Sequence, residues 1–156
     1  MFNFSNKNVL ITGGASGIGK LMGELVLQKG AKLIIWDINQ KNIDETRSQF
    51  SKFGKVVGYN VDVADIEQVK ITAKIVKEEH GAVDVLINNA GISGELPQNA
   101  SNTNITEIQK VFDTNFFGVI SVSQAFLELL KKSENPRISN ITSGLGSLTL
   151  HSAPTW

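Results

Sequence analysis

Glycine, carboxylate, amide and hydroxyl residues recur in this chain directly after apolar segments, where they could bind a phosphate-bearing ligand. The first apolar segment ends in the turn Thr12-Gly13-Gly14-Ala15-Ser16-Gly17-Ile18-Gly19. A glycine turn that opens a helix brings backbone N–H groups and the positive end of the helix dipole close to an anion. Glycine suits this place because a Cβ would block both the close approach and a positive φ. The turn therefore indicates a phosphate site, most simply for a nucleotide.

The turn alone leaves other interpretations open. A glycine-rich turn between strand and helix can be purely structural. Its spacing, G-x3-G-x-G, departs from the dinucleotide fingerprint G-x-G-x-x-G. The segment from Gly14 to Lys20 nearly fits a P-loop, but Leu21 stands where a Ser or Thr should hold magnesium. Because leucine offers no oxygen to a metal, an NTPase is the weakest of these hypotheses.

Apolar strands alternate with helical patterns along the chain, which predicts an α/β fold with a doubly wound parallel sheet. We expect strands at residues 8–12, 32–36, 56–61, 83–88 and 137–142. Segments such as 32–36 are mostly apolar, as buried parallel strands are. Helices should then cover both faces of the sheet.

Helix signals stand between these strands. The segments Asp65–Gln68 and Thr106–Gln109 are typical of capping boxes, and the second should open a helix that runs to about Lys132. Gly81 suits the end of the earlier helix, and His80 suits the negative end of its dipole, so we interpret His80 as structural. The helix after the glycine turn carries an apolar stripe at helical spacing: Ile18, Leu21, Met22, Leu25 and Val26.

Asn115 lies inside the apolar stripe of the long helix, four residues from both Val111 and Val119. A polar amide on an apolar helix face costs free energy unless it is hydrogen-bonded. The residue is therefore either a satisfied core amide or part of a site, and the pattern favours neither.

Polar residues gather at the carboxyl ends of the expected strands, where open parallel sheets bind ligands. The first strand ends in the glycine turn. Each polar group at a strand end, taken alone, has an ordinary explanation as a turn former or helix cap. Five groups along one edge of a sheet instead predict one binding site. The four later groups are Asp37, Asp62-Val63, Asn88-Asn89-Ala90-Gly91 and Thr142-Ser143-Gly144.

Asp37 refines the expected ligand because it lies 18 positions after Gly19, at the end of the next strand. A carboxylate near that distance accepts both hydroxyls of an adenosine ribose and repels a 2′-phosphate. This favours NAD over NADP. A P-loop assigns no role to an acid at this position.

Composition narrows the function classes further. The chain has 156 residues with fifteen basic and fifteen acidic side chains, so its charge favours neither a nucleic acid nor a membrane surface. Cysteine is absent, which excludes disulfides and fits a reducing compartment. The two histidines, His80 and His151, lack metal-ligand spacing, and no segment resembles a signal peptide or a membrane span. We therefore expect one cytoplasmic domain over residues 1–156, without a metal.

Together these motifs resemble those of the short-chain dehydrogenases/reductases, in their best-known branch, over the whole chain. The glycine turn is similar to the family's cofactor loop, and residues 88–91 are similar to its fourth-strand motif. Asn115 resembles the family's helix asparagine, and residues 140–143 resemble the strand that carries its catalytic serine. The resemblance implies a Rossmann-type fold and an NAD(P)-dependent oxidoreductase. Such an enzyme interconverts an alcohol and a ketone or aldehyde by hydride transfer, commonly as a homo-oligomer.

The resemblance also implies roles for the matching residues. The glycine turn would contact the pyrophosphate, Asp37 the adenosine ribose, and Asp62 with Val63 the adenine. Ser143 would hydrogen-bond the substrate oxygen, and Asn115 would hold a water in a proton relay. Asn88 would tie neighbouring strands together. The implied cofactor set is Gly13, Ser16, Gly17, Ile18, Gly19, Asp37, Asp62, Val63, Asn89, Ala90 and Gly91.

The chain departs from the family in its acid/base. The family uses a tyrosine and, four positions later, a lysine that lowers the pKa of that tyrosine and holds the nicotinamide ribose. The only tyrosine here is Tyr59, and the position thirteen residues after Ser143 is Trp156, whose indole does not titrate. We therefore expect a truncated dehydrogenase, in which the Tyr-x-x-x-Lys motif and the last strands lie beyond Trp156.

Two other functions stay open at this point. A protein that has lost its catalytic half would bind a nucleotide without catalysis, as a fragment or pseudoenzyme. A phosphate-loop NTPase is the third hypothesis, against which Leu21 argues. The substrate and the favoured direction of reaction are open in all cases.

Overall fold

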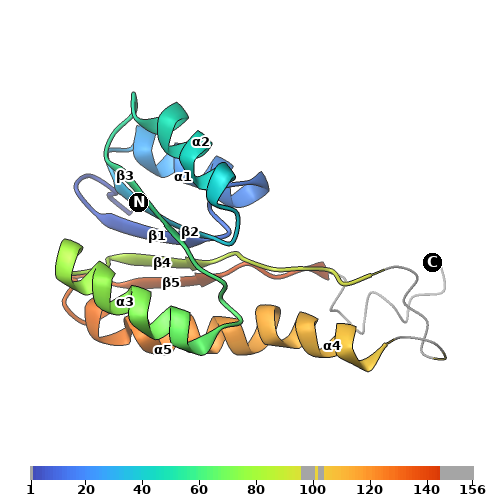
Figure 1. The fold of residues 1–156 in the computed structure, drawn as a ribbon. Coiled ribbons are helices and arrows are strands. Elements are labelled where there is room, and N and C mark those ends of the chain that lie inside the picture. Colours follow the sequence, from blue (N-terminus) through green and yellow to red (C-terminus); the bar gives the residue numbers. More distant parts are fainter. Residues whose placement is uncertain (1, 96–100, 102–103, 145–156) are drawn as a thin grey trace.

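A parallel sheet of five strands forms the centre of the computed structural model, which describes residues 2–95, 101 and 104–144 (Figure 1). The strands lie in the order β3-β2-β1-β4-β5, and each neighbouring pair is parallel. The five expected strands are confirmed, with shifts of one or two residues at some ends. Their bounds are β1 (Asn8–Thr12), β2 (Lys32–Asp37), β3 (Val56–Asn60), β4 (Val85–Asn88) and β5 (Arg137–Asn140).

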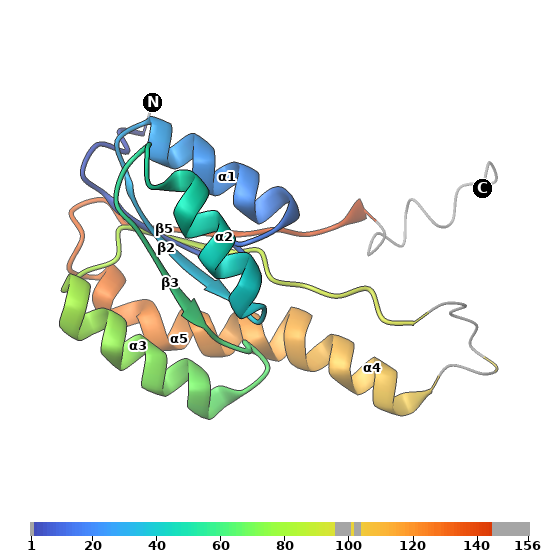
Figure 2. The ribbon, with the colours of Figure 1, turned by 45° about the horizontal axis from the view of Figure 1, so that its top comes forward.

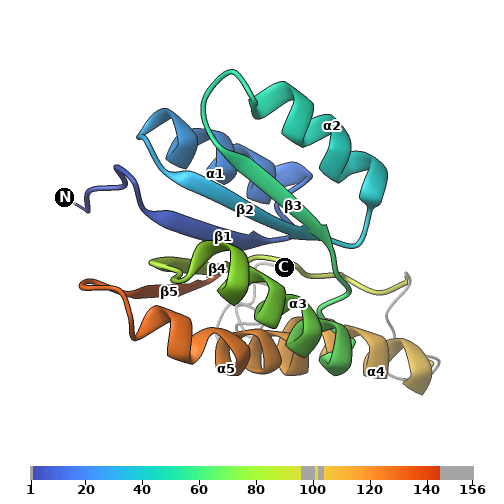
Figure 3. The ribbon, with the colours of Figure 1, turned by 60° about the vertical axis from the view of Figure 1, so that its left-hand side comes forward.

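Helices cover both faces of this sheet, which confirms the doubly wound, Rossmann-type fold (Figure 1, Figure 3). α1 (Gly17–Gln28) and α2 (Gln40–Phe50) lie on one face. The other face carries α3 (Ile66–His80), α4 (Ile105–Phe112), the π-helical η1 (Asp113–Gly118) and α5 (Val119–Leu130). Among the described residues, no helix has the length and apolar character that crossing a bilayer requires.

The strand order creates a crevice at the carboxyl edge of the sheet. The chain runs outward from β1 to β3 and then returns through α3 to the opposite side of β1, where β4 lies. At this switch point the connections after β1 and β4 leave toward opposite faces, and open α/β sheets bind ligands there. Figure 2 shows α4 extending toward the side at which β4 and β5 end.

Two apolar cores hold the layers together. Leu10 and Trp36 belong to the core under α3 and α5. There the Trp36 and Phe126 rings pack edge to face, with 5.0 Å between the ring centroids. Val9 and Ile11 belong to the core under α1 and α2. Because successive strand residues point to opposite faces, a strand covered on both sides must be apolar throughout. The mostly apolar segments of the sequence are therefore the central strands.

The helix after the glycine turn is confirmed, but its predicted apolar stripe mostly faces away from the sheet. Ile18, Leu21 and Leu25 are 64%, 61% and 56% exposed, although Val26 is buried. A Cβ on Gly23 would lie 2.9 Å from the Leu33 side chain, so α1 approaches the sheet through its glycines. Glycine carries no apolar signal, which is why the pattern indicated the wrong face.

The two predicted capping boxes have different outcomes. Asp65 caps α3 by accepting from the N–H groups of Glu67 and Gln68, as expected. The box at Thr106 is wrong, because Asn104 caps α4 by accepting from the Thr106 N–H at 2.9 Å. Asparagine is the better cap of the two residue types, and its position moves the helix start to Ile105.

The long helix after this cap has about the expected extent, but its middle is π-helical at η1. A π-helical turn inside an α-helix is rare and often occurs at a functional site. Asn115 lies in this segment. The sequence pattern was read as one continuous α-helix and gave no sign of the interruption.

The end of α3 is structural, as predicted. Gly81 ends the helix with a φ of 75°, and the Nε2 atom of His80 lies 3.1 Å from the Tyr59 hydroxyl. That hydroxyl donates to Glu79 at 2.5 Å. Burial and the Glu79 carboxylate raise the pKa of Tyr59, and burial lowers the pKa of His80. The chain's single tyrosine is therefore held in its neutral form.

Asp84 is a buried carboxylate that joins three separate segments. Its oxygens accept from the Asn8 N–H at 2.8 Å and from the Ser133 hydroxyl at 2.6 Å, and Lys7 lies 3.2 Å away. Burial acts to raise the pKa of Asp84, but the bonds from Ser133, Asn8 and Lys7 outweigh it and lower that pKa.

We expect Asp84→Asn to lower the free energy of unfolding at neutral pH by about 1–3 kcal/mol, because these donors lose a charged acceptor. A carboxyl whose pKa is lower in the folded state stabilises the fold above its unfolded pKa, and this contribution disappears as the pH falls through the folded value. Urea denaturation at several pH values should show the difference in unfolding free energy between parent and variant closing as the pH falls below 3.8, the ordinary pKa of the carboxyl. A gap independent of pH would contradict this role.

Candidate functional site

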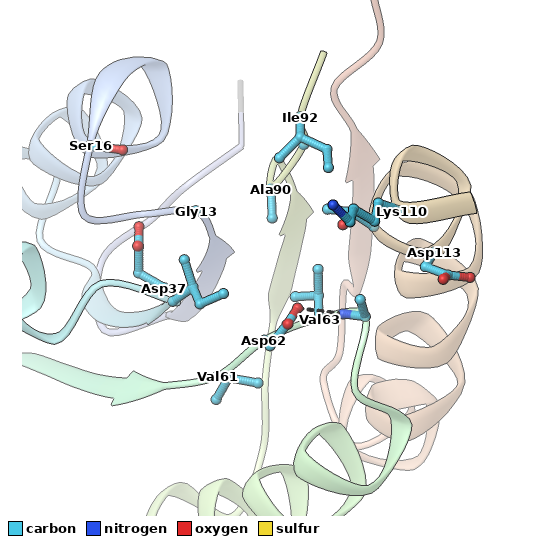
Figure 4. A pocket seen from close by; sticks show the side chains of 14 residues that line it. Gly13, Ser16, Asp37, Val61, Asp62, Val63, Ala90, Ile92, Lys110 and Asp113 are labelled. Carbon is cyan, nitrogen blue, oxygen red and sulfur yellow. Dashed lines mark hydrogen bonds between the residues drawn. The ribbon is translucent and has the colours of Figure 1, made fainter. Parts of the chain in front are cut away.

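A cavity of about 430 Å³ opens at the carboxyl ends of β1 to β4, between the glycine turn and the helix formed by α4 and η1 (Figure 4). This volume falls in the range of pockets that hold small molecules and cofactors. Five segments of the chain supply its walls: Gly13 and Ser16; Asp37 and Ile38; Val61, Asp62, Val63 and Ala64; Ala90, Gly91 and Ile92; and Lys110, Asp113 and Thr114.

Glycines shape the turn on one side of this cavity. Gly13 and Gly17 have φ values of 62° and 50°, in the region that favours glycine. A Cβ on Gly19 would lie 2.2 Å from the carbonyl oxygen of Gly13, far inside contact distance. A Cβ on Gly17 would have no described atom within 4 Å, so the turn has open space on its outer side.

The start of α1 is the natural place for an anion beside this turn. Side chains cap α2, α3 and α4, whereas Ser16 makes no such hydrogen bond at α1. Backbone N–H groups in the first turn of a helix lack intrahelical partners and carry partial positive charge. Ser16 lines the cavity, and Gly17, Ile18 and Gly19 form the first turn directly after it.

Asp37 is a nearly buried carboxylate that points toward the glycine turn (Figure 4). Its Oδ2 atom accepts from the Ala15 N–H at 3.0 Å, and its Oδ1 atom accepts from the Asn39 N–H at 3.0 Å. These two bonds fix the orientation of the group. Because an ionised carboxylate offers about four acceptor positions, capacity remains for two ligand hydroxyls.

The segment after β3 forms a partly apolar wall. Val61 and Val63 are buried, and Ile38 from the β2 loop also lines the cavity with a side chain that is 67% exposed. The Oδ1 atom of Asp62 accepts from the Ala64 N–H at 2.9 Å, which fixes this turn. An apolar wall with a carboxylate beside it suits a flat ring that carries N–H groups.

Asn89 holds the glycine turn through hydrogen bonds. Its side-chain amide donates to the carbonyl oxygens of Thr12 and Gly13 at 3.0 and 3.2 Å. The Thr12 hydroxyl in turn accepts from the N–H groups of Asn89 and Ala90. The Asn89 side chain therefore faces the turn, while Ala90 and Gly91 face the cavity.

Asn88 ties the end of the sheet together, as the family resemblance implied. Its side-chain amide donates to Asn140 on β5 at 2.9 Å and to Ser123 on α5 at 3.0 Å. These bonds join β4, β5 and α5.

Asn115 is a satisfied amide, although it lies at the surface and not in the core. Its Oδ1 atom accepts from the Ile92 N–H at 2.9 Å, and its Nδ2 atom donates to the Ile92 carbonyl at 2.8 Å. The pair fixes the segment after β4 against η1. The predicted water would therefore have to bind elsewhere on this residue than at these two bonded positions.

Ser143 lies three residues after β5 and is exposed, but it does not line the cavity. His151 and Trp156 lie outside the described residues. The structure thus gathers residues from the ends of β1 to β4 around one cavity, and the expected catalytic serine is not among its lining residues.

The lining residues of α4 and η1 were missed by the sequence reasoning. Lys110, Asp113 and Thr114 recur at helical spacing just before Asn115, and this spacing was the available signal. Lys110 is the one basic side chain among the lining residues, against three carboxylates. A hydrogen bond to Glu107 raises the pKa of Lys110 and holds it charged.

These features fit a nucleotide whose phosphate lies at the glycine turn. The turn has backbone N–H groups at a helix start and open space where a side chain would otherwise stand. Asp37 offers acceptors to ribose hydroxyls beside the turn, and the wall beyond it is apolar.

Comparison with known proteins gives a consistent result. Residues 7–155 match a family model described as short chain dehydrogenase. Estradiol 17-beta-dehydrogenase 11 of Mus musculus is 35% identical over 139 residues, which cover 88% of this chain and 46% of that protein. This chain spans about half the length of the curated relatives it matches.

Solved structures show the same likeness. A short chain dehydrogenase/reductase from Burkholderia phymatum in complex with NAD is 31% identical with a TM-score of 0.82, over 92% of this chain and 51% of that one. The Pseudomonas aeruginosa RhlG/NADP active-site complex is 28% identical with a TM-score of 0.82, over 92% of this chain and 58% of that one.

Proposed function

The chain belongs to the short-chain dehydrogenase family, and from that premise we propose that it binds NAD in this cavity as part of an oxidoreductase. The reaction is the interconversion of an alcohol and a ketone or aldehyde by hydride transfer. The observation that carries the proposal is the placement of Asp37 beside an open glycine turn at a helix start. NAD, when bound, supplies the acceptor or donor of the hydride.

The residues of this chain bind and orient the dinucleotide. The N–H groups at the start of α1 would bind the pyrophosphate, and Ser16 lines the cavity beside them. Asp37 would accept from the adenosine ribose, and Ile38, Asp62 and Val63, which line the cavity, would hold the adenine. Ala90 and Gly91, which also line the cavity, would hold the remaining half of the ligand.

Two residues of this chain would serve the chemical step. Ser143 follows β5 and hydrogen-bonds the substrate oxygen, which carries developing charge during hydride transfer. Asn115 fixes Ile92 and so holds the segment after β4, which would bind the nicotinamide end of the ligand. The tyrosine and lysine of the family have no counterpart between Ser143 and Trp156, and Tyr59 is bonded to Glu79 and His80.

A preference for NAD over NADP follows from the charge of Asp37. We expect calorimetric titration of residues 1–156 to give a lower Kd for NADH than for NADPH, by about tenfold or more. A 2′-phosphate would meet this carboxylate at short range and would also remove one of its hydroxyl donors. Asp37→Ser should bring the Kd values for NADPH and NADH closer together, mainly by weakening the binding of NADH.

The Asp37 variant needs a structural control, because this carboxylate also holds the Ala15 and Asn39 N–H groups. Asp37→Asn has the same shape and keeps one carbonyl oxygen, so it separates the effect of the negative charge from the effect of the shape of the side chain. Melting temperatures of both variants show whether the turn survives. Equal affinities of the parent protein for NADH and NADPH would overturn the assigned preference.

A second function, nucleotide binding without catalysis, is favoured by one observation. The single tyrosine of the chain lies on β3 and outside the cavity lining, with its hydroxyl bonded to Glu79. Under this alternative the cavity binds the same ligand, and only the chemical step is absent.

A further inference from the structure

We infer that Thr46, on α2, is a positioning residue for the dinucleotide, which holds the glycine turn at a fixed distance from Asp37. The inference rests on the proposed function, because it concerns the same cavity. Thr46 does not line that cavity, and the sequence patterns gave it no role.

Thr46 is fully buried, and its hydroxyl donates to the carbonyl oxygen of Ala15 at 3.1 Å. Ala15 is the middle of the glycine turn and is itself 3% exposed. Its N–H donates in the other direction, to the Oδ2 atom of Asp37 at 3.0 Å. A single residue of the turn is therefore held from two sides by two different elements.

The contacts close into a ring through α2. The second oxygen of Asp37 accepts from the Asn39 N–H, and the Asn39 side chain caps α2 by accepting from the Asn42 N–H at 3.1 Å. Thr46 lies on that same helix, and its hydroxyl donates to the Ala15 carbonyl oxygen, which closes the ring. The turn, the end of β2 and α2 thus cannot shift separately without breaking one of these bonds.

The distance between Asp37 and the start of α1 matters for a dinucleotide because its ribose and its pyrophosphate are covalently joined. Asp37 meets the ribose and the start of α1 meets the pyrophosphate, so both ends of the contact must be correctly spaced at once. Removing the Thr46 hydroxyl leaves a buried carbonyl at Ala15 without its donor, which favours a shifted turn. A ligand that meets only Asp37 tolerates such a shift.

The test compares ADP-ribose, which spans both contacts, with adenosine, which reaches only the ribose site. Both are titrated into residues 1–156 by NMR. Thr46→Val removes the hydroxyl with little change in shape, Thr46→Ser keeps it, and Thr72→Val alters a buried threonine on α3, outside the cavity lining. We expect Thr46→Val to weaken ADP-ribose by about fivefold and to leave adenosine unchanged. The other two variants should bind both ligands like the parent.

The outcomes separate this inference from the proposed function. Failure of the parent protein to bind ADP-ribose and adenosine overturns the proposed function. Unchanged ADP-ribose affinity in Thr46→Val overturns only the inference, and so does an equal loss for both ligands, which marks a general structural effect. If Thr46→Val does not fold, Thr46→Cys provides the same comparison, since a thiol is a weak donor of similar size.

Discussion

Residues 1–156 are expected to bind NADH without turning over alcohols, ketones or aldehydes at a useful rate. Hydride transfer at a carbonyl carbon leaves charge on the oxygen, and a positioned acid or base that neutralises it contributes about 10²–10⁴-fold. Ser143 can donate a hydrogen bond but is a poor proton donor near neutral pH. Tyr59 is neutral, bonded to Glu79, and outside the cavity lining.

The measurement is NADH absorbance with a panel of substrates, on protein whose NADH binding has been established by titration. If NADH binds but no substrate turns over, the lack of activity is due to the missing acid/base and not to misfolding. The loss should exceed the proton-transfer effect, because the family's lysine also orients the nicotinamide and orientation is a large contribution of its own. Steady turnover that Ser143→Ala abolishes would show that another residue of this chain is the acid/base.

Gly19→Ala should abolish NADH binding at concentrations that saturate the parent protein. The added Cβ would stand 2.2 Å from the Gly13 carbonyl oxygen and 2.6 Å from the Asn89 amide. Backbone cannot yield as a flexible side chain can, so the turn must open. Forced overpacking of this kind typically costs about 1–3 kcal/mol, and here it also displaces the phosphate site.

Gly23→Ala is the matched control, one turn later on the same helix. Its Cβ would meet a terminal carbon of Leu33 at 2.9 Å, and that end of a flexible side chain can move. The control should lose some stability and keep its NADH affinity, as measured by thermal melting and calorimetry. Parent-like NADH binding by Gly19→Ala would show that the turn does not hold the pyrophosphate.

Much of the site was predictable because parallel strands place their carboxyl ends at one edge. The residues after each strand therefore converge whatever the intervening helices do, and Asp37, Asp62 and Ala90 duly line one cavity. The strand-tying role of Asn88, which the family resemblance implied, is confirmed by its hydrogen bond to Asn140.

Other features depended on contacts that no local pattern records. α1 approaches the sheet at Gly19 and Gly23, which carry no apolar signal, and three residues of the predicted stripe, Ile18, Leu21 and Leu25, stay exposed. The hydrogen bond from Thr46 to Ala15 joins residues 31 positions apart. The π-helical turn at η1 arises where the long helix meets the β4 loop through Asn115, a pairing that helical periodicity does not contain.

The most direct test of the central claim is to follow the backbone amides of isotope-labelled residues 1–156 by NMR while NADH is added. If the dinucleotide binds in this cavity, saturable shifts will appear at Gly13, Ser16, Asp37, Val63 and Gly91. The amide of Gly81, at the far end of α3, will stay in place. Saturable shifts confined to residues away from the cavity, or no shifts at millimolar NADH, would contradict the assignment of this cavity as a dinucleotide site.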